Sequence, residues 1–389
     1  MKYRLADITD FNPRETIKKG SVAKKVAMDK LQPFCRDIPE YEYSEFTGGV
    51  KFRNGDTIMA RITPCLENGK TAKVNILDDG EVGFGSTEYI VFRARKNVTD
   101  EDYLYYLVCS PLVREPAIKS MVGSSGRQRV QTDVVQNLEI IIPELDVQKK
   151  IGSILRALDD KIALNNAINK NLEQQAASYF TELFITNADP SWHEGYISDL
   201  GTVVGGSTPS KKKPEYYTDN GIAWITPKDL SVDKSKFISH GADDITELGL
   251  RNSSASIMPA GTVLFSSRAP IGYIAIADGE VTTNQGFKSV VPHKHVGTAF
   301  VYFFLKNALP TIENMASGST FKEISGSAMR VVPAIIPDNN SLKRFSDFCE
   351  PLFTLQRTLE DENRHLCSMR DSLLPRLMSG ELDATDIDL

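Results

Sequence analysis

Two stretches of the chain place apolar or polar-seam residues at alternating steps of three and four, which is the spacing of one stripe on an α-helix. They lie within residues 144–187 and 338–380, so that the second follows the first by about 194 positions. The first stripe consists of Ile151, Leu155, Leu158, Ile162, Asn165, Asn169, Leu172, Ala176, Tyr179 and Leu183. The second stripe is assigned to Phe345, Phe348, Leu352, Leu355, Leu359, Glu362, Leu366, Met369 and Leu373.

Each helix would be about 55 to 60 Å long at about 1.5 Å per residue, and neither could bury its stripe alone. We therefore predict that the two helices pack against each other as an antiparallel coiled coil. The alternative is that they are ordinary core helices of two separate domains. The repeat of the segments that precede them argues against that alternative.

These preceding segments also correspond to each other. Residues 55–64 align with 261–270 at an offset of 206, residues 103–107 align with 301–305 at 198, and residues 141–143 align with 335–337 at 194. Turn signals separate short β-type runs between residues 46 and 92, and a helix broken or restarted at Pro111 and Pro116 is expected at about 100–121. Residues 138–142 are expected to form a buried strand.

The duplication predicts an α+β fold, in which two mixed α/β globular domains in pseudo-twofold arrangement are separated by two long helices that form an antiparallel coiled coil. We expect five segments: a first globular domain at 1–143, the first long helix at 144–187, a second globular domain at 188–337, the second long helix at 338–380 and an acidic tail at 381–389.

Composition places the chain among globular proteins, because 41% of its 389 residues are hydrophobic. We expect a cytoplasmic protein without a membrane span, since the start lacks an apolar signal segment and the longest apolar run, residues 299–305, is too short to cross a bilayer. The net charge is −6. That value does not exclude nucleic-acid binding, because phosphate affinity depends on local clusters of Lys and Arg.

The sequence predicts neither a catalytic residue nor a metal site. Residues 66–71 end like a phosphate-binding loop, but Pro64 stands where the GxxxxGK[ST] pattern requires glycine, so that a β-turn is favoured. The motifs GxGxxG, HExxH and GxSxG and the Asx-Pro-Pro-aromatic tetrapeptide of methyltransferases do not occur. The five cysteines lack zinc-site spacing, and the pair His293 and His295 is more typical of an exposed loop than of a metal site.

Two polar loops at equivalent points of the two halves indicate a polyanionic partner. Residues 123–129 read Gly-Ser-Ser-Gly-Arg-Gln-Arg, and residues 317–322 read Ser-Gly-Ser-Thr-Phe-Lys. Glycine allows close approach, hydroxyl groups can bond phosphate oxygens, and Arg or Lys can reach phosphates or guanine edges. The alternative for either loop is a solvent-exposed turn with incidental charge. We predict DNA contacts on and beside these loops at Arg61, Ser124, Ser125, Arg127, Arg129, Lys228, Arg268, Ser319, Thr320 and Lys322.

The chain resembles the DNA-specificity (S) subunits of type I restriction-modification systems. The resemblance covers nearly the whole chain and is carried by five short motifs in order. These are Gly-Gly-Ser-Thr-Pro at 205–209, Ile-Ala-Trp-Ile-Thr-Pro-Lys-Asp at 222–229, Thr-Asn-Gln-Gly-Phe at 283–287, the Ile-Pro before each long helix, and Leu-Leu-Pro-Arg-Leu-Met-Ser-Gly-Glu-Leu at 373–382. The first half departs from the pattern, with Gly-Ser-Thr-Glu at 85–88 in place of the Asn-Gln-Gly segment.

The resemblance implies a non-catalytic protein with two target-recognition domains, each of which reads one half of a bipartite DNA sequence, and adds Asn284 to the expected DNA contacts. The helical pair would act as a ruler between the half-sites. Two methyltransferase subunits using S-adenosylmethionine would dock around the helices, and an ATP-driven, magnesium-dependent restriction subunit would join them, so that no cofactor is expected on this chain. The residues that mark the docking helices are Ile151, Leu158, Leu172, Leu352, Leu359 and Leu366.

Two other functions remain open from the sequence. One is a self-sufficient DNA methyltransferase or nuclease with an unrecognised active site, which would show activity of the purified chain alone. The other is a coiled-coil interaction protein that does not bind DNA, which would show salt-independent behaviour on heparin.

Overall fold

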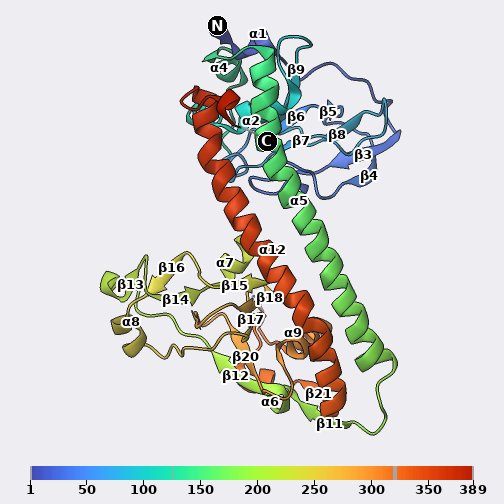
Figure 1. The fold of residues 1–389 in the computed structure, drawn as a ribbon, viewed down its shortest axis with the longest axis vertical. Helices are drawn as coiled ribbons and strands as arrows, with labels where there is room; N and C mark the ends of the chain where they lie inside the picture. Colours follow the sequence, from blue (N-terminus) through green and yellow to red (C-terminus); the bar gives the residue numbers. More distant parts are fainter. Residues whose placement is uncertain (1, 125, 319–321, 388–389) are drawn as a thin grey trace. The chain divides into compact units, whose positions relative to one another are not determined.

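The computed structural model describes residues 2–124, 126–318 and 322–387 (Figure 1). The chain forms two compact units. Unit 1 consists of Met1–Leu164 together with Asn363–Leu389, and unit 2 consists of Asn165–Glu362. Two long helices therefore contribute one part to each unit: α5 (Leu145–Thr181), which continues as the π-helix η2 (Glu182–Thr186), and α12 (Asn339–Ser379).

Unit 1 is rich in short strands. They are β1 (Lys2–Arg4), β2 (Thr9–Phe11), β3 (Val22–Val26), β4 (Glu42–Glu45), β5 (Val50–Phe52), β6 (Thr57–Ala60), β7 (Thr71–Lys73), β8 (Gly83–Gly85), β9 (Tyr89–Ala94) and β10 (Glu139–Ile141). Its shorter helices are α1 (Leu5–Ile8), η1 (Met28–Lys30), α2 (Glu101–Cys109), α3 (Pro111–Lys119), α4 (Thr132–Gln136) and η4 (Ala384–Asp386). Within the described residues, the sheets have the strand orders β2-β9-β6-β7, β4-β3-β8-β5 and β1-β10.

Unit 2 follows the same plan with additional elements. Its strands are β11 (His193–Tyr196), β12 (Gly201–Gly205), β13 (Tyr217–Thr218), β14 (Ile222–Ile225), β15 (Phe237–Ile238), β16 (Asp243–Ile245), β17 (Val263–Ser267), β18 (Ile271–Ala277), β19 (Thr282–Thr283), β20 (Lys288–Pro292) and β21 (Pro333–Ile336). Its shorter helices are α6 (Ile197–Leu200), η3 (Pro214–Tyr216), α7 (Pro227–Val232), α8 (Glu247–Arg251), α9 (Thr298–Asn307), α10 (Leu309–Met315) and α11 (Gly326–Arg330). In the described part of the chain, the sheets run β12-β20-β17-β18-β15, β13-β16-β14-β19 and β11-β21.

The antiparallel packing of the two long helices is confirmed. In unit 2, the Asn165 side chain of α5 donates a hydrogen bond to Glu362 of α12 at 2.8 Å. Further along α5, the Asn169 carbonyl accepts a hydrogen bond from Gln356 of α12 at 3.0 Å. Residue numbers rise along α5 while those of the partners fall along α12, so the two helices run in opposite directions.

The predicted stripe on α12 is wrong at three of its nine positions, whereas Glu362 is half-buried and accepts a hydrogen bond from Asn165 of α5. Five members of the predicted stripe are buried or half-buried, as expected: Phe345, Leu352, Leu359, Leu366 and Leu373. Three other predicted members are exposed, with exposed fractions of 37% for Phe348, 44% for Leu355 and 52% for Met369. The positions that pack inward instead are their polar or small neighbours Cys349, Gln356 and Arg370.

The reason is that these inward polar groups have partners that apolar periodicity cannot reveal. The Gln356 side chain donates to the Asn169 carbonyl and accepts from Lys236 at 2.6 Å. In unit 1, Arg370 donates to the buried Asp159 carboxylate at 2.8 Å. Buried polar groups are tolerated when they are hydrogen-bonded, so the stripe continues through them and the larger apolar neighbours turn outward.

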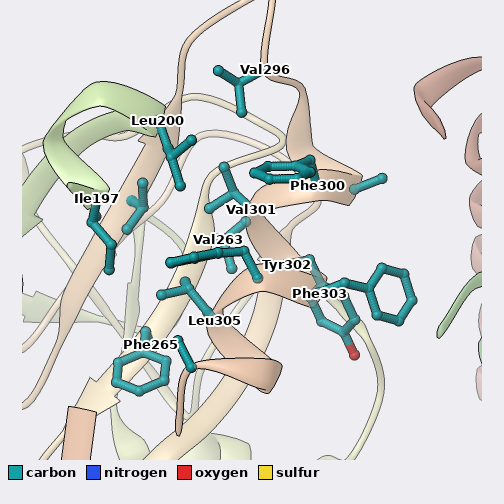
Figure 2. Close-up of a cluster of buried hydrophobic side chains, with 14 of the residues drawn as sticks. Ile197, Leu200, Val263, Phe265, Val296, Phe300, Val301, Tyr302, Phe303 and Leu305 are labelled. Carbon is teal, nitrogen blue, oxygen red and sulfur yellow. The ribbon is translucent and has the colours of Figure 1, made fainter. Parts of the chain in front are cut away.

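Helix α9 forms the centre of the unit 2 core, because its residues 299–305 are buried on every side. Figure 2 shows Val301 and Leu305 facing Val263 and Phe265 of β17, whereas Tyr302 and Phe303 leave the helix on the other side. Phe303 packs with its ring centroid 6.0 Å from that of Phe345 on α12. An all-round apolar helix is typical of a core position between two layers, here a sheet and the long helices.

Two expectations for unit 1 are decided by the structure. The predicted helix at about 100–121 divides at Ser110 into α2 and α3, with Pro111 in the first turn of α3, where its missing N–H costs nothing. The predicted buried strand at 138–142 is wrong in its burial: β10 pairs with β1 in a two-stranded ribbon, so Ile140 is buried while Ile141 is exposed. Side chains alternate between the faces of such a ribbon.

Candidate nucleic-acid interface

Two predicted residues, Arg61 and Arg129, lie together with the acid Glu88 in unit 1. We call these three residues the first charge junction. Arg61 directly follows β6, Glu88 directly precedes β9, and Arg129 lies at the end of the polar loop that follows α3. Backbone hydrogen bonds bring the three together. Arg61 N–H donates to the Glu88 carbonyl at 2.9 Å, and Val130 N–H donates to the Arg61 carbonyl at 2.9 Å.

The strongest contact of the first charge junction joins Arg129 and Glu88. The Arg129 Nε donates to both Glu88 carboxylate oxygens at 2.9 and 3.0 Å, and Nη2 donates to Oε1 at 2.7 Å. Hydrogen bonding by Arg129 lowers the pKa of Glu88 from its usual value, so this carboxylate is ionised at neutral pH. The exposed side-chain fractions are 46% for Arg129 and 24% for Glu88. The pair is therefore well formed but accessible to a ligand.

Arg61 faces the loop backbone. Its Nη2 donates to the Val130 carbonyl at 3.0 Å, and its Nε is buried without a hydrogen-bond partner among the described residues. The half-buried guanidinium thus holds the base of the polar loop and adds positive charge beneath it. A direct contact between Arg61 and DNA stays a prediction.

Unit 2 contains a second charge junction, formed by Arg268, Lys288 and Glu323. Arg268 follows β17, Lys288 begins β20, and Glu323 lies in the polar loop that precedes α11. The Glu323 carboxylate lies 3.4 Å from Arg268 Nη1 and 3.5 Å from Lys288 Nζ. Two cations therefore share one acid, at distances longer than those between Arg129 and Glu88.

The two junctions are built on the same backbone framework. Ser267 N–H donates to the Gly286 carbonyl at 2.7 Å, and Ile324 N–H donates to the Ser267 carbonyl at 3.1 Å. These bonds match those of residues 61, 88 and 130 at the sequence offsets of 206, 198 and 194. In this correspondence Gly286 replaces Glu88 and Glu323 replaces Arg129. The acid thus moves from the strand side of the junction to the loop.

Asn284 and Lys228 lie beside the second charge junction. The Asn284 side-chain oxygen accepts a hydrogen bond from Gly286 N–H at 2.8 Å. A Cβ atom added to Gly286 would lie 2.9 Å from Pro227 Cγ, which shows how closely the start of α7 packs on this segment. Lys228, the next residue of α7, is exposed. Asn284 is therefore occupied in shaping its own turn, whereas Lys228 presents its charge to solvent.

The remaining predicted DNA-contacting residues lie on the two loops. Ser124 and Arg127 are exposed on the loop of unit 1, and Lys322 is exposed on the loop of unit 2. Ser125, Ser319 and Thr320 lie outside the described residues. The structure thus brings Arg61 and Arg129 together. In unit 2, Arg268 forms an isolated antiparallel bridge with Glu323, the residue that follows Lys322.

Sequence reasoning missed Glu88, Lys288 and Glu323. Glu88 ends the motif by which the first half departs from the second, and Glu323 follows the predicted Lys322 directly. The predicted DNA contacts were chosen among Arg, Lys and small polar residues, so the carboxylates that pair with the cations were not included. The available signal was the alignment itself, which sets Arg129 opposite Glu323.

The six helix residues expected to mark partner docking face inward. Ile151, Leu172 and Leu359 are buried within this chain, and Leu158, Leu352 and Leu366 are half-buried. They therefore serve the chain's own packing. If a partner docks on these helices, the side chains open to it include Phe348, Leu355 and Met369, which are exposed on α12.

The described ranges contain neither a metal site nor a membrane-spanning helix. Among residues 2–124, 126–318 and 322–387, no group of three His, Cys, Asp or Glu side chains could hold a metal ion. In the same part of the chain, no helix is long and apolar enough to cross a membrane.

Comparison with known proteins decides the family. The family model described as the type I restriction modification DNA specificity domain matches residues 1–174 and 190–364. The chain belongs to this family. Both matches begin at a globular segment and run into a long helix, in agreement with the duplication read from the sequence.

Individual relatives agree with the family assignment. The HindI specificity subunit of Haemophilus influenzae is 25% identical over 408 aligned positions, which cover 85% of this chain and 87% of that protein. The MjaIX specificity subunit of Methanocaldococcus jannaschii is 41% identical over 160 residues, 41% of this chain but only 37% of that protein. The crystal structure of the type I restriction-modification S subunit from M. genitalium shares the fold, with a TM-score of 0.56 at 16% identity over 97% of this chain and 96% of that one.

Family membership establishes the general role. The protein is a non-catalytic specificity subunit with bipartite target-recognition domains, and it works in a type I restriction-modification complex with DNA. The cofactors of such systems belong to partner subunits. The charge junctions can thus be interpreted as parts of a recognition surface.

Proposed function

We propose that the two charge junctions are the centres of two DNA-reading surfaces, one for each half of a bipartite target. The target-recognition domain at residues 1–143 would read one half-site with Arg61, Ser124, Ser125, Arg127 and Arg129. The domain at residues 188–337 would read the other with Lys228, Arg268, Asn284, Ser319, Thr320 and Lys322. The observation that carries this proposal is the repeated backbone framework with rearranged charges.

The local charge supports this assignment although the chain has a net charge of −6. Each junction contains two cations and one carboxylate, and the exposed Arg127 precedes Arg129 on the loop of the first junction. Local clusters of Lys and Arg provide the salt-dependent affinity for phosphates, and side chains at the groove edge provide the sequence discrimination. A shared framework with different side chains is what two different half-sites require.

In the same proposal, the helices of residues 144–187 and 338–380 space the half-sites and hold the catalytic partners. Two methyltransferase subunits that use S-adenosylmethionine would dock on exposed side chains such as Phe348, Leu355 and Met369 of α12. Restriction subunits that use ATP and magnesium would join this core. The complex would act in the cytoplasm, where DNA is its substrate. The acidic tail at 381–389 would not contact the DNA.

The test is co-expression of the chain with a type I methyltransferase subunit from the same genome, followed by size determination and duplex binding at several salt concentrations. We expect a complex of one specificity subunit with two methyltransferase subunits, which binds DNA more tightly than the chain alone. A chain that stays free and modifies or cleaves DNA by itself would contradict the proposal and favour a self-sufficient enzyme. Salt-independent passage over heparin by both the chain and the complex would favour an interaction protein.

A further inference from the structure

Glu88 holds Arg129 in a defined orientation. Its carboxylate accepts three hydrogen bonds from one edge of the guanidinium, the edge that carries Nε and Nη2. Backbone bonds fix both partners, because Arg129 pairs with Val122 and Ile62, and the carbonyl of Glu88 accepts from Arg61. The opposite edge, which carries Nη1, has no partner among the described residues. Arg129 is thus anchored on one side and open on the other.

A guanidinium has five N–H donors in a rigid plane, so that one edge can bind a carboxylate while the other binds a second acceptor pair. In the major groove, guanine presents O6 and N7 as such a pair, and arginine that donates to both is the commonest specific contact. An unanchored arginine must lose rotamer freedom to make this contact. An arginine that is already anchored has lost this rotamer freedom before it binds, so it favours a single geometry of contact with the base.

We propose that Arg129, positioned by Glu88, reads a guanine in the half-site contacted by unit 1. Arg129 is the specificity-determining residue, and Glu88 is a positioning residue that does not contact the DNA. This proposal rests on the proposed function of the chain and deepens it by naming the base and the residue pair. Arg127, two residues earlier on the exposed loop, is left to contact phosphate.

Unit 2 supplies an internal contrast. Gly286 stands where Glu88 stands in unit 1, and the residue that corresponds to Arg129 is Glu323. Its carboxylate is shared between Arg268 and Lys288 at 3.4 and 3.5 Å. Among the described residues neither cation is held by a bidentate pair, so of the two junctions it is the first that presents an anchored arginine. Substitutions at Glu88 should therefore change one half of the recognised sequence and leave the other half unchanged.

The experiment selects bound duplexes from a random pool with the assembled complex, for the wild type and for Glu88→Gln, Arg129→Lys and the control Glu115→Gln. Gln is close in size to Glu, but it is neutral and has one acceptor oxygen in place of two, so it cannot accept the bidentate hydrogen bonds from Arg129. Lys keeps the charge but lacks the planar fork. Glu115 lies in the same unit, is exposed, and pairs only with Lys119 at 3.5 Å among the described residues. Affinities for matched and single-mismatch duplexes are then measured across a salt series.

We expect the wild type to select a bipartite sequence with a guanine at one defined position. Arg129→Lys and Glu88→Gln should both reduce the preference for guanine at that same position by roughly 5- to 150-fold, with the second half-site and the Glu115→Gln profile unchanged. A preserved second half-site shows that the variants are folded and assembled.

Three results would overturn the inference. A uniform loss of affinity for all sequences in an additional variant, Arg129→Ala, with a salt slope reduced by about one, would make Arg129 a phosphate contact. A uniform gain of affinity with Glu88→Gln would make Glu88 only a repulsive charge. An unchanged selected sequence in both variants would remove the pair from recognition while the proposed function stands. If the wild type selects no sequence at all, the proposed function itself fails.

Discussion

The two charge junctions share their backbone and differ in their charges. In both, a residue at the end of a central strand bonds to the segment before the neighbouring strand of the sheet and to the returning loop. In unit 1 the acid lies on the strand side and the loop presents arginine, whereas in unit 2 the loop presents the acid and the strand side presents lysine. The comparison teaches that hydrogen bonds of the main chain preserve the scaffold after duplication, while side chains at one point are free to change partners.

The same contrast exists where each unit packs on the long helices. Unit 1 buries an ion pair between Asp159 and Arg370, with the Tyr106 hydroxyl donating to Asp159 at 2.6 Å. Unit 2 instead buries Lys236, which pairs with Glu173 of α5 and donates to Gln356 of α12, and Gln356 donates in turn to the Asn169 carbonyl. Because the polar groups differ, substitutions can weaken one unit without touching the other.

The largest effect is expected from Asp159→Ala, which removes the buried acidic partner of Arg370 in unit 1 and leaves it the exposed Asp371. Removing one partner of a buried ion pair costs about 3–5 kcal/mol. Hydrogen exchange should show faster amide exchange in α2 and α3 of unit 1, and little change in α9 of unit 2. Asp159→Leu combined with Arg370→Met should recover most of the loss, since both charges are then absent.

Asp146→Ala is the matched control for that substitution, because Asp146 lies on the same helix but is exposed and pairs only with Lys149 at 3.2 Å among the described residues. It should change stability by less than about 0.5 kcal/mol. Equal loss of protection in both units with Asp159→Ala would contradict the view that the units are stabilised separately.

A smaller effect is expected from Asp338→Ala in unit 2. Asp338 precedes α12 and accepts hydrogen bonds from Asn340 N–H, Ser341 N–H and the Ser341 hydroxyl at 2.7 to 3.0 Å, and from Trp192 Nε1 at 3.0 Å. Loss of such a helix cap costs about 1 kcal/mol. Both tryptophans, Trp192 and Trp224, lie in unit 2, so unfolding followed by tryptophan fluorescence reports this unit.

The stabilisation by Asp338 should depend on pH. Hydrogen bonds, the largest from the Ser341 hydroxyl, lower its pKa to about 2, below the value of about 3.9 in an unfolded chain. A depressed pKa in the folded state gives stabilisation that is present above about pH 4 and is lost as the pH falls towards 2. Wild type and Asp338→Ala should therefore differ at pH 7 and converge near pH 2. Glu144, the equivalent residue before α5, is exposed, and Glu144→Ala is the matched control for the effect of Asp338→Ala at pH 7.

The fold could be predicted from the sequence to the extent that apolar periodicity and self-similarity carry it. The two helices, their antiparallel packing and the offsets of the repeat all follow from positions such as Ile151 and Phe345, which are buried as expected. The prediction for α12 was wrong at Phe348, because Cys349 packs inward in its place. At Gln356 and Arg370 the inward position is decided by polar partners. Such partners lie far away in sequence, so no local pattern records them.

The candidate site could be predicted only in part. Loop composition identified Arg129, and the alignment identified Arg268, because cations beside glycine and serine are a recognisable pattern. Glu88 and Glu323 were missed because a carboxylate that orients a cation looks like any exposed acid until the two are seen together. Each carboxylate lies 41 or 55 positions from its arginine in the chain, and backbone bonds bring these segments together.

The most direct test of the central claim compares charge reversal in the two units. The assembled complex would carry Arg127→Glu with Arg129→Glu in unit 1, or Arg268→Glu with Lys322→Glu in unit 2, and its affinity would be measured for the selected target and for targets with either half-site scrambled. We predict that each pair of reversals removes the preference for one half-site, a different one in each case, at about 1–3 kcal/mol per lost base contact, and retains the preference for the other. Loss of the same half-site in both variants, equal loss of both half-sites, or no loss would contradict the account.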